Sequence, residues 1–157
     1  MKTDIFSEDT RNFLVLLEKY EVKYIIIGGM AVVYYGYPRL TGDVDFYYDI
    51  AGDNVHRLYQ ALQEFWENDI PNIEHEKELL EPGIIIQFGI EPNRIDLMNN
   101  IDGVDFNDAW KNKNVESIKM GNNKIRIYFI GRDQLIRNKK ALGRNKDLDD
   151  LTFLKGK

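Results

Sequence analysis

Apolar side chains recur at helical spacing in several parts of the chain, and polar residues or glycines bound each part. Residues 8–20 carry four of them behind a serine and two acidic residues, which favour the start of a helix. Asp53 opens a second helix whose apolar residues share one face. Residues 133–142 and 146–154, separated by Gly143, predict two closing helices. Each helix has an apolar face that must be covered by another element.

Runs of β-branched and aromatic residues predict strands between these helices. Residues 23–27 predict a buried strand that ends at Gly28–Gly29, and residues 30–35 continue as a short helix. Residues 43–50 are strand-like. Two hairpins are predicted, one from residues 83–90 with 94–98 and one from residues 115–120 with 124–130. This order predicts an α+β fold, a mixed β-sheet flanked by helices.

Length and composition narrow the class of protein. The 157 residues are enough for one core, and we expect a single domain spanning residues 1–157. With 43% apolar and 30% charged residues the chain is typical of soluble globular proteins, and no apolar run approaches the ~20 residues of a membrane-spanning helix. The N-terminus is acidic where a secretory signal needs an apolar core, and cysteine is absent, so we expect a cytoplasmic protein with no membrane partner. The net charge of -5 disfavours a protein that coats nucleic acid by bulk charge.

Two acidic residues, Asp43 and Asp45, lie one residue apart in the strand-like run. Because side chains alternate along a strand, both carboxylates point the same way, and like charges this close favour a cation between them. Asp96 is a third acid in a β-type run that could lie beside this strand. Three oxygen ligands of this kind suit Mg²⁺ or Mn²⁺. The alternative is that the aspartates face solvent and have no function, as most single acidic residues do.

A glycine pair, Gly28–Gly29, lies between the predicted buried strand and the short helix. Bare backbone and exposed N–H groups there can approach a polyphosphate closely, although glycine pairs usually mark only a tight turn. The order of strand, glycine pair, short helix, Asp-x-Asp and a later aspartate within a strand resembles the nucleotidyltransferase superfamily of the DNA polymerase β type. It is similar above all to the small single-domain bacterial members, including those grouped with abortive-infection toxin proteins. The residues that carry the resemblance are Gly28, Gly29, Arg39, Thr41, Asp43, Asp45 and Asp96.

Residues 135–154 carry a second match, which resembles the C-terminal helical segment of those small proteins. Together the two matches extend over residues 24–154. One position departs from the pattern, because many relatives have a lysine directly before the first aspartate, where this chain has Gly42. The residues in register in the second match are Lys139, Arg144, Lys146 and Asp147.

The resemblance implies a polymerase β palm-like fold and a metal-dependent nucleotidyltransferase. By this resemblance Asp43, Asp45 and Asp96 hold two divalent ions, Mg²⁺ or Mn²⁺, on a nucleoside triphosphate. An acceptor hydroxyl then attacks the α-phosphorus and pyrophosphate leaves, with Asp96 anchoring an ion or accepting the proton. The acceptor stays open between a small molecule, a protein and an RNA end, and a toxin–antitoxin partner is a further expectation. The residues expected to bind the nucleotide are Gly28, Gly29, Arg39, Thr41 and Lys139.

Lys139 lies at the centre of the apolar face of its own predicted helix. A lysine there either extends past the core to solvent or directs its ammonium into a site, where a triphosphate would supply the missing counter-charge. Geometry leaves both open, and the resemblance favours the phosphate. Arg144 and Lys146 are expected to pair with nearby aspartates of the last helix instead, namely Asp147, Asp149 or Asp150.

Other functions remain as alternatives to an enzyme of this kind. The first is a non-catalytic nucleotide-binding or partner-binding module, such as a toxin–antitoxin component with this fold. A phosphohydrolase of the haloacid-dehalogenase type also uses Asp-x-Asp, but its nucleophile directly follows a buried apolar strand, whereas a polar segment precedes Asp43 here. The two histidines, His56 and His75, lie in polar surroundings that do not favour a histidine metal site or general base.

Overall fold

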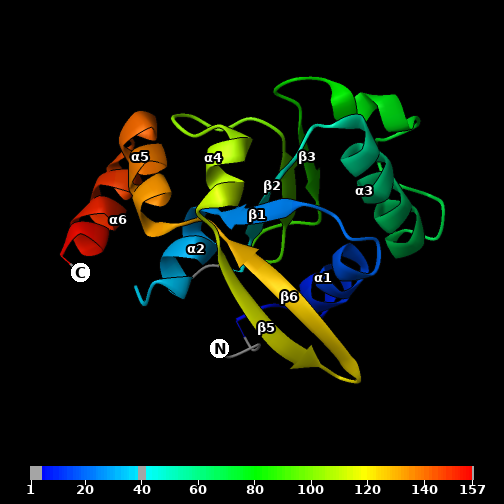
Figure 1. Ribbon diagram of the computed structural model, residues 1–157, viewed down its shortest axis with the longest axis horizontal. Helices are drawn as coiled ribbons and strands as arrows, with labels where there is room; N and C mark the ends of the chain where they lie inside the picture. Colours follow the sequence, from blue (N-terminus) through cyan, green and yellow to red (C-terminus); the bar gives the residue numbers. More distant parts are fainter. Residues whose placement is uncertain (1–4, 39–41, 157) are drawn as a thin grey trace.

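One mixed sheet of six strands forms the centre of the molecule, in the spatial order β3-β4-β2-β1-β6-β5 (Figure 1). The computed structural model describes residues 5–38 and 42–156. The strands are β1 (Tyr24–Ile27), β2 (Val44–Tyr48), β3 (Ile85–Phe88), β4 (Ile95–Met98), β5 (Asn114–Met120) and β6 (Asn123–Phe129). The helices are α1 (Glu8–Lys19), α2 (Gly28–Tyr34), α3 (Gly52–Phe65), the 3₁₀ helix η1 (Glu76–Leu80), α4 (Phe106–Lys111), α5 (Arg132–Leu142) and α6 (Asn145–Lys155). The predicted α+β architecture is confirmed.

Both predicted hairpins are present, because β3 pairs antiparallel with β4 and β5 pairs antiparallel with β6. The central strands are joined differently: β1 is antiparallel to β2 but parallel to β6, and β2 is parallel to β4. A parallel pair needs a crossover connection, and the chain between β2 and β4 passes through α3, η1 and the edge strand β3. The two strands that carry the aspartates are therefore direct neighbours near the middle of the sheet.

Strand β2 is covered on both faces. Phe46 meets Phe13 of α1 edge to face, with 5.4 Å between the ring centroids. On the opposite face Tyr47 meets Phe106 of α4 at 5.2 Å. These contacts fix the strand, because a shift by one residue would exchange the two faces. Asp45 shares the face of Tyr47 and is the one residue of β2 that is only half-buried.

Some elements differ from those that the sequence patterns predict. The patterns do not predict η1 or α4, which have five and six residues and are too short for a repeated helical spacing of apolar positions. The short second helix begins at Gly28 rather than near residue 30, and Gly28 has a φ of +69°, a conformation that other residues rarely adopt. Within residues 5–38 and 42–156, no helix has both the length and the apolar character that crossing a membrane requires.

The two C-terminal helices, α5 and α6, lie together on the side of the molecule opposite α1 and α3 in Figure 1. A buried ionic network joins them. Lys139 of α5 is 2% exposed, and its Nζ lies 3.2 Å from Asp147 Oδ1 and 3.0 Å from Asp150 Oδ2 of α6. Arg144, in the turn between the helices, donates from Nε to Asp147 Oδ2 at 2.6 Å. Burial tends to raise the pKa of Asp147, but the hydrogen bonds from Arg144 and Lys139 outweigh it and lower this pKa to about 2.

Replacing the central carboxylate of this network should destabilise the fold. We expect Asp147→Asn to lower the free energy of unfolding by about 3 kcal/mol near neutral pH, because the buried Lys139 and the partly exposed Arg144 lose a shared partner. Urea unfolding measures the change. The exposed Asp149 of the same helix provides the control, and Asp149→Asn should stay within about 0.5 kcal/mol of wild type.

The effect of Asp147 should also depend on pH with a defined sign. Because its pKa is lower in the folded than in the unfolded state, the native state binds fewer protons, and the carboxylate contributes fully above its ordinary pKa of 3.8. This contribution decreases as the pH falls towards 2. The difference between wild type and Asp147→Asn should therefore be smaller at about pH 3 than at about pH 6. A difference that grows towards acid would contradict the assignment.

Candidate active site

The three aspartates singled out from the sequence lie together at one end of the sheet. Asp45 of β2 and Asp96 of β4 are directly opposite in the parallel register of these strands. Asp43 precedes β2, and its Oδ1 accepts a hydrogen bond of 2.8 Å from the backbone N–H of Arg94, just before β4. The turn at Gly28 lies against Asp45, so the end of β1 belongs to the same place. The structure thus brings Asp43, Asp45 and Asp96 together.

Asp96 lies close enough to Asp45 to oppose the ionisation of the Asp45 carboxyl group. Asp96 is 5% exposed, and Asp45 is half-buried. Burial, and next the neighbouring carboxylate of Asp96, raise the pKa of Asp45 to about 6. A carboxyl pKa raised by burial and by a neighbouring like charge is typical of functional sites.

Arg94 provides part of that positive charge in this structure. Its Nε lies 2.8 Å from Asp96 Oδ1, and its Nη2 lies 3.1 Å from Asp96 Oδ2, which is the two-pronged geometry of the strongest arginine–carboxylate pairs. The same Nη2 is 3.9 Å from Asp43 Oδ2, and Nη1 is 3.1 Å from Glu91. The guanidinium therefore lies where it screens Asp96 and Asp43 from each other.

The turn at Gly28 lies so close to Asp45 that this position requires a glycine. A Cβ atom on Gly28 would overlap Oδ2 of Asp45, and the positive φ of this residue also disfavours a side chain. Gly29 follows as the second residue of α2 and is half-buried. The absence of side chains at both positions leaves bare backbone beside the carboxylates.

Packing also explains why position 42, which departs from the family pattern, is a glycine. A Cβ atom there would overlap the backbone carbonyl oxygen of Pro92 and approach Asn93 Oδ1 to 3.4 Å. The segment before β4 thus occupies the space into which a side chain at position 42 would extend. The lysine of the relatives cannot be accommodated here without a shift of that segment.

The basic residues near the C-terminus lie on the opposite wall. Lys139 is buried, as its place on the apolar face predicts, but Asp147 and Asp150 supply its counter-charge within the protein. Arg144 pairs with Asp147 as predicted, yet its side chain is 51% exposed and also faces the aspartates. Lys146 is exposed. A role of Lys139 in phosphate binding stays a prediction.

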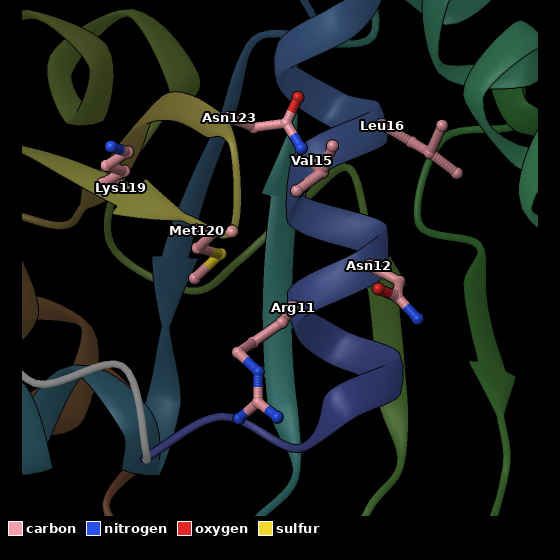
Figure 2. A pocket seen from close by; sticks show the side chains of 8 residues that line it. Arg11, Asn12, Val15, Leu16, Lys119, Met120 and Asn123 are labelled. Atoms are coloured by element: carbon pink, nitrogen blue, oxygen red, sulfur yellow. The ribbon is translucent and has the colours of Figure 1, made fainter.

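These groups line one cavity of about 290 Å³. Its lining consists of Gly28, Gly29, Asp43, Asp45, Ile85, Gln87, Glu91, Arg94, Asp96, Met98, Lys139, Arg144 and Lys146. A larger cavity of about 540 Å³ lies between α1 and the tip of the β5–β6 hairpin, where Figure 2 shows Arg11 and Val15 of α1 near Met120 of the hairpin. None of the described residues that line this larger cavity is acidic or aromatic. The smaller, charged cavity is therefore the candidate active site.

Two predicted nucleotide-binding residues, Arg39 and Thr41, lie outside the described residues. Arg94 was not predicted, although a signal existed: it lies two residues before Asp96, so an extended backbone puts both side chains on one face.

Within residues 5–38 and 42–156, no three side chains among histidine, cysteine, aspartate and glutamate are grouped closely enough to hold a metal ion. The contact of Arg94 with both Asp96 and Asp43 agrees with this finding.

A solved structure has a fold similar to that of this chain. The chain is similar to the crystal structure of a candidate nucleotidyltransferase from Thermotoga maritima, with a TM-score of 0.53 and 16% sequence identity. The similarity covers 94% of this chain and 91% of the other. At this identity the likeness concerns the fold alone. No curated protein matches the sequence.

A family model matches residues 6–153 and is described as "Nucleotidyltransferase of unknown function (DUF6036)". The match includes the glycine turn, all three aspartates, α5 and α6 as far as residue 153. It confirms the resemblance seen in the sequence, and the fold agrees with it. The chain belongs to this family of nucleotidyltransferases.

Proposed function

We propose that this protein is a metal-dependent nucleotidyltransferase that moves a nucleoside monophosphate from a nucleoside triphosphate to an acceptor hydroxyl. The observation that carries the proposal is the register of β2 and β4, which sets Asp45 beside Asp96 with Asp43 next to them, in a cavity bounded by glycines and cations. Family membership supports nucleotidyl transfer as the reaction class. The nucleoside triphosphate substrate, the acceptor hydroxyl and the metal dependence are proposed here from the chemistry of the cavity.

The donor set is chemically suited to Mg²⁺ or Mn²⁺, because all three groups are carboxylates. Asp43, Asp45 and Asp96 would hold the metal, which would require the guanidinium of Arg94 to leave Asp96. Bound there, divalent ions stabilise the negative charge on the attacking and leaving oxygens of an in-line displacement. The raised pKa of Asp45 supports this assignment, since a bound cation would offset the repulsion that raises it.

The remaining residues bind the polyphosphate and move the proton. Gly28 and Gly29 let the phosphates approach the backbone, and Arg144 and Lys146 offer positive charge from the opposite wall. The acceptor oxygen forms a bond to the α-phosphorus while the bond to the bridging oxygen of the β-phosphate breaks, and pyrophosphate leaves. Asp96 accepts the proton of the acceptor hydroxyl. Arg39, Thr41 and Lys139 are further phosphate ligands in this proposal.

A non-catalytic module with the same fold is the second candidate, for instance a component of a toxin–antitoxin pair. The observation that favours it is the two-pronged hold of Arg94 on Asp96, which engages both oxygens of a carboxylate that the reaction needs free. Such a module binds its partner or a nucleotide without turning it over. Turnover of a nucleoside triphosphate, which an enzyme should lose in Asp43→Asn, separates the two candidates.

Nucleotide binding should depend on the first two aspartates. We expect at least one of the four nucleoside triphosphates to bind wild type more tightly, by at least about tenfold, with Mg²⁺ than with a chelator. In Asp43→Asn/Asp45→Asn the affinities with Mg²⁺ and with chelator should become equal, because the carboxylates that hold the metal are gone. Calorimetric titration measures both. The control, Asp69→Asn/Asp149→Asn, removes two exposed charges and should keep the metal dependence. If Asp43→Asn/Asp45→Asn also keeps it, Asp43 and Asp45 are not ligands of the metal.

Arg94 should compete with the metal for Asp96. We expect Arg94→Ala to raise the affinity for Mn²⁺ without nucleotide by about tenfold, because the guanidinium no longer neutralises the carboxylates. Electron paramagnetic resonance of free Mn²⁺ measures this affinity, and the thermal shift caused by Mn²⁺ should increase in parallel. Arg126→Ala is the control, since Arg126 pairs with Glu18 at 3.0 Å away from the site. Unchanged or weaker Mn²⁺ binding in Arg94→Ala would mean that Asp96 does not hold the metal.

A further inference from the structure

The cavity of the three aspartates adjoins a second one of about 310 Å³, formed where the end of β1, the chain after β4 and α5 meet. The two cavities share lining residues, so they lie side by side, and we refer to both together as the recess. The residues that line both are Gly28, Asp45, Ile85, Met98, Lys139 and Arg144. We call the second part the side cavity.

The side cavity has a different chemical character from the cavity of the aspartates. Its own walls add the apolar side chains of Ile27, Ile101 and Leu142, and polar groups come from Asn100, Asp102 and Asn138. The shared walls contribute two more apolar side chains, one of which, on the edge strand β3, is 60% exposed. Apolar walls with a few polar groups are what a small organic ligand needs, whereas the charged cavity suits phosphates and a metal.

Hydrogen bonds hold the walls of the side cavity in place. Asn138 of α5 is 3% exposed, and its Nδ2 donates to the backbone carbonyl of Asp102 at 2.8 Å, which ties α5 to the chain after β4. At the start of the same segment, Asn99 is buried and its Oδ1 accepts from the backbone N–H of Gly83 at 2.8 Å. The side cavity is therefore formed before a ligand arrives.

We propose that the side cavity binds the nucleoside part of the triphosphate, with the base against Ile101 and Leu142. This inference rests on the proposed function. The base and ribose are covalently joined to the α-phosphate, so they must lie beside the aspartates, as the side cavity does. A base also offers apolar faces and a polar edge. The volume is at the lower end of the about 300–1,000 Å³ of small-molecule sites. The acceptor then enters from the charged side, past Gln87 and Glu91.

The test separates the nucleoside from the phosphates by using inorganic tripolyphosphate as a second probe. Leu142→Trp fills the side cavity from the end of α5, at a residue that does not line the cavity of the aspartates. Asn100→Trp fills it from the other wall. Leu148→Trp is the matched control, because Leu148 of α6 is 53% exposed and lines neither cavity. Circular dichroism and thermal unfolding verify that each variant is folded.

With Mg²⁺ present, we expect wild type to bind its preferred nucleoside triphosphate at least about tenfold more tightly than tripolyphosphate, since only the former has a base to bury. Leu142→Trp and Asn100→Trp should each abolish this preference. In both variants the affinity for the nucleotide should fall about tenfold, while the affinity for tripolyphosphate should stay within about twofold of wild type. Leu148→Trp should behave as wild type. If both filled variants bind the nucleotide as wild type does, the nucleoside lies elsewhere and the inference is wrong, although the proposed function stands. If neither probe binds wild type, the proposed function fails and the inference with it.

Discussion

The parallel pairing of β2 with β4 is the constraint on which the whole site depends. It places Asp45 opposite Asp96, and the apolar contacts on both faces of β2 prevent the strand from slipping to relieve the repulsion. The carboxylates are thus held together by the free energy of the core rather than by any attraction of their own. Such a local conflict within an otherwise consistent fold is typical of functional sites. The conflict is reduced locally by Arg94, whose charge lies against Asp96 and Asp43.

Two groups of charged side chains meet in the recess, and they differ in how completely their charges are neutralised by partners within the protein. Lys139, Asp147 and Asp150 form a closed system in which each charge has an internal partner. The aspartates at the end of the sheet form an open one, because Arg94 is shared among Asp96, Asp43 and Glu91. Arg144 touches both, since it pairs with Asp147 and faces the aspartates. The helices α5 and α6 therefore act as a rigid wall, while the ends of β2 and β4 are the part of the site able to receive further positive charge.

Much of this architecture follows from the sequence, because its signals are local. The spacing of Asp43 and Asp45 gives a shared face, and Gly28 marks a turn that permits no side chain. Contacts between distant segments could not be predicted in the same way. The partners of Lys139 depend on how α6 packs against α5, and the approach of the segment before β4 to Gly42 depends on the path of the chain after β3. The helices η1 and α4 were missed because five or six residues contain too few apolar positions to establish a period.

The close contact at Gly42 has a consequence for how this protein can change over evolution. The carbonyl of Pro92 fills the space that a side chain at position 42 would need, so no substitution there is accepted while the segment before β4 keeps its path. That same segment leads directly into Arg94, whose backbone N–H binds Asp43. A lineage that acquired the lysine of the relatives would first have to shorten or reroute this segment, and would then alter the position of the arginine as well. Introducing a lysine at position 42 therefore requires remodelling the backbone that leads to Arg94, and a point mutation alone is not enough.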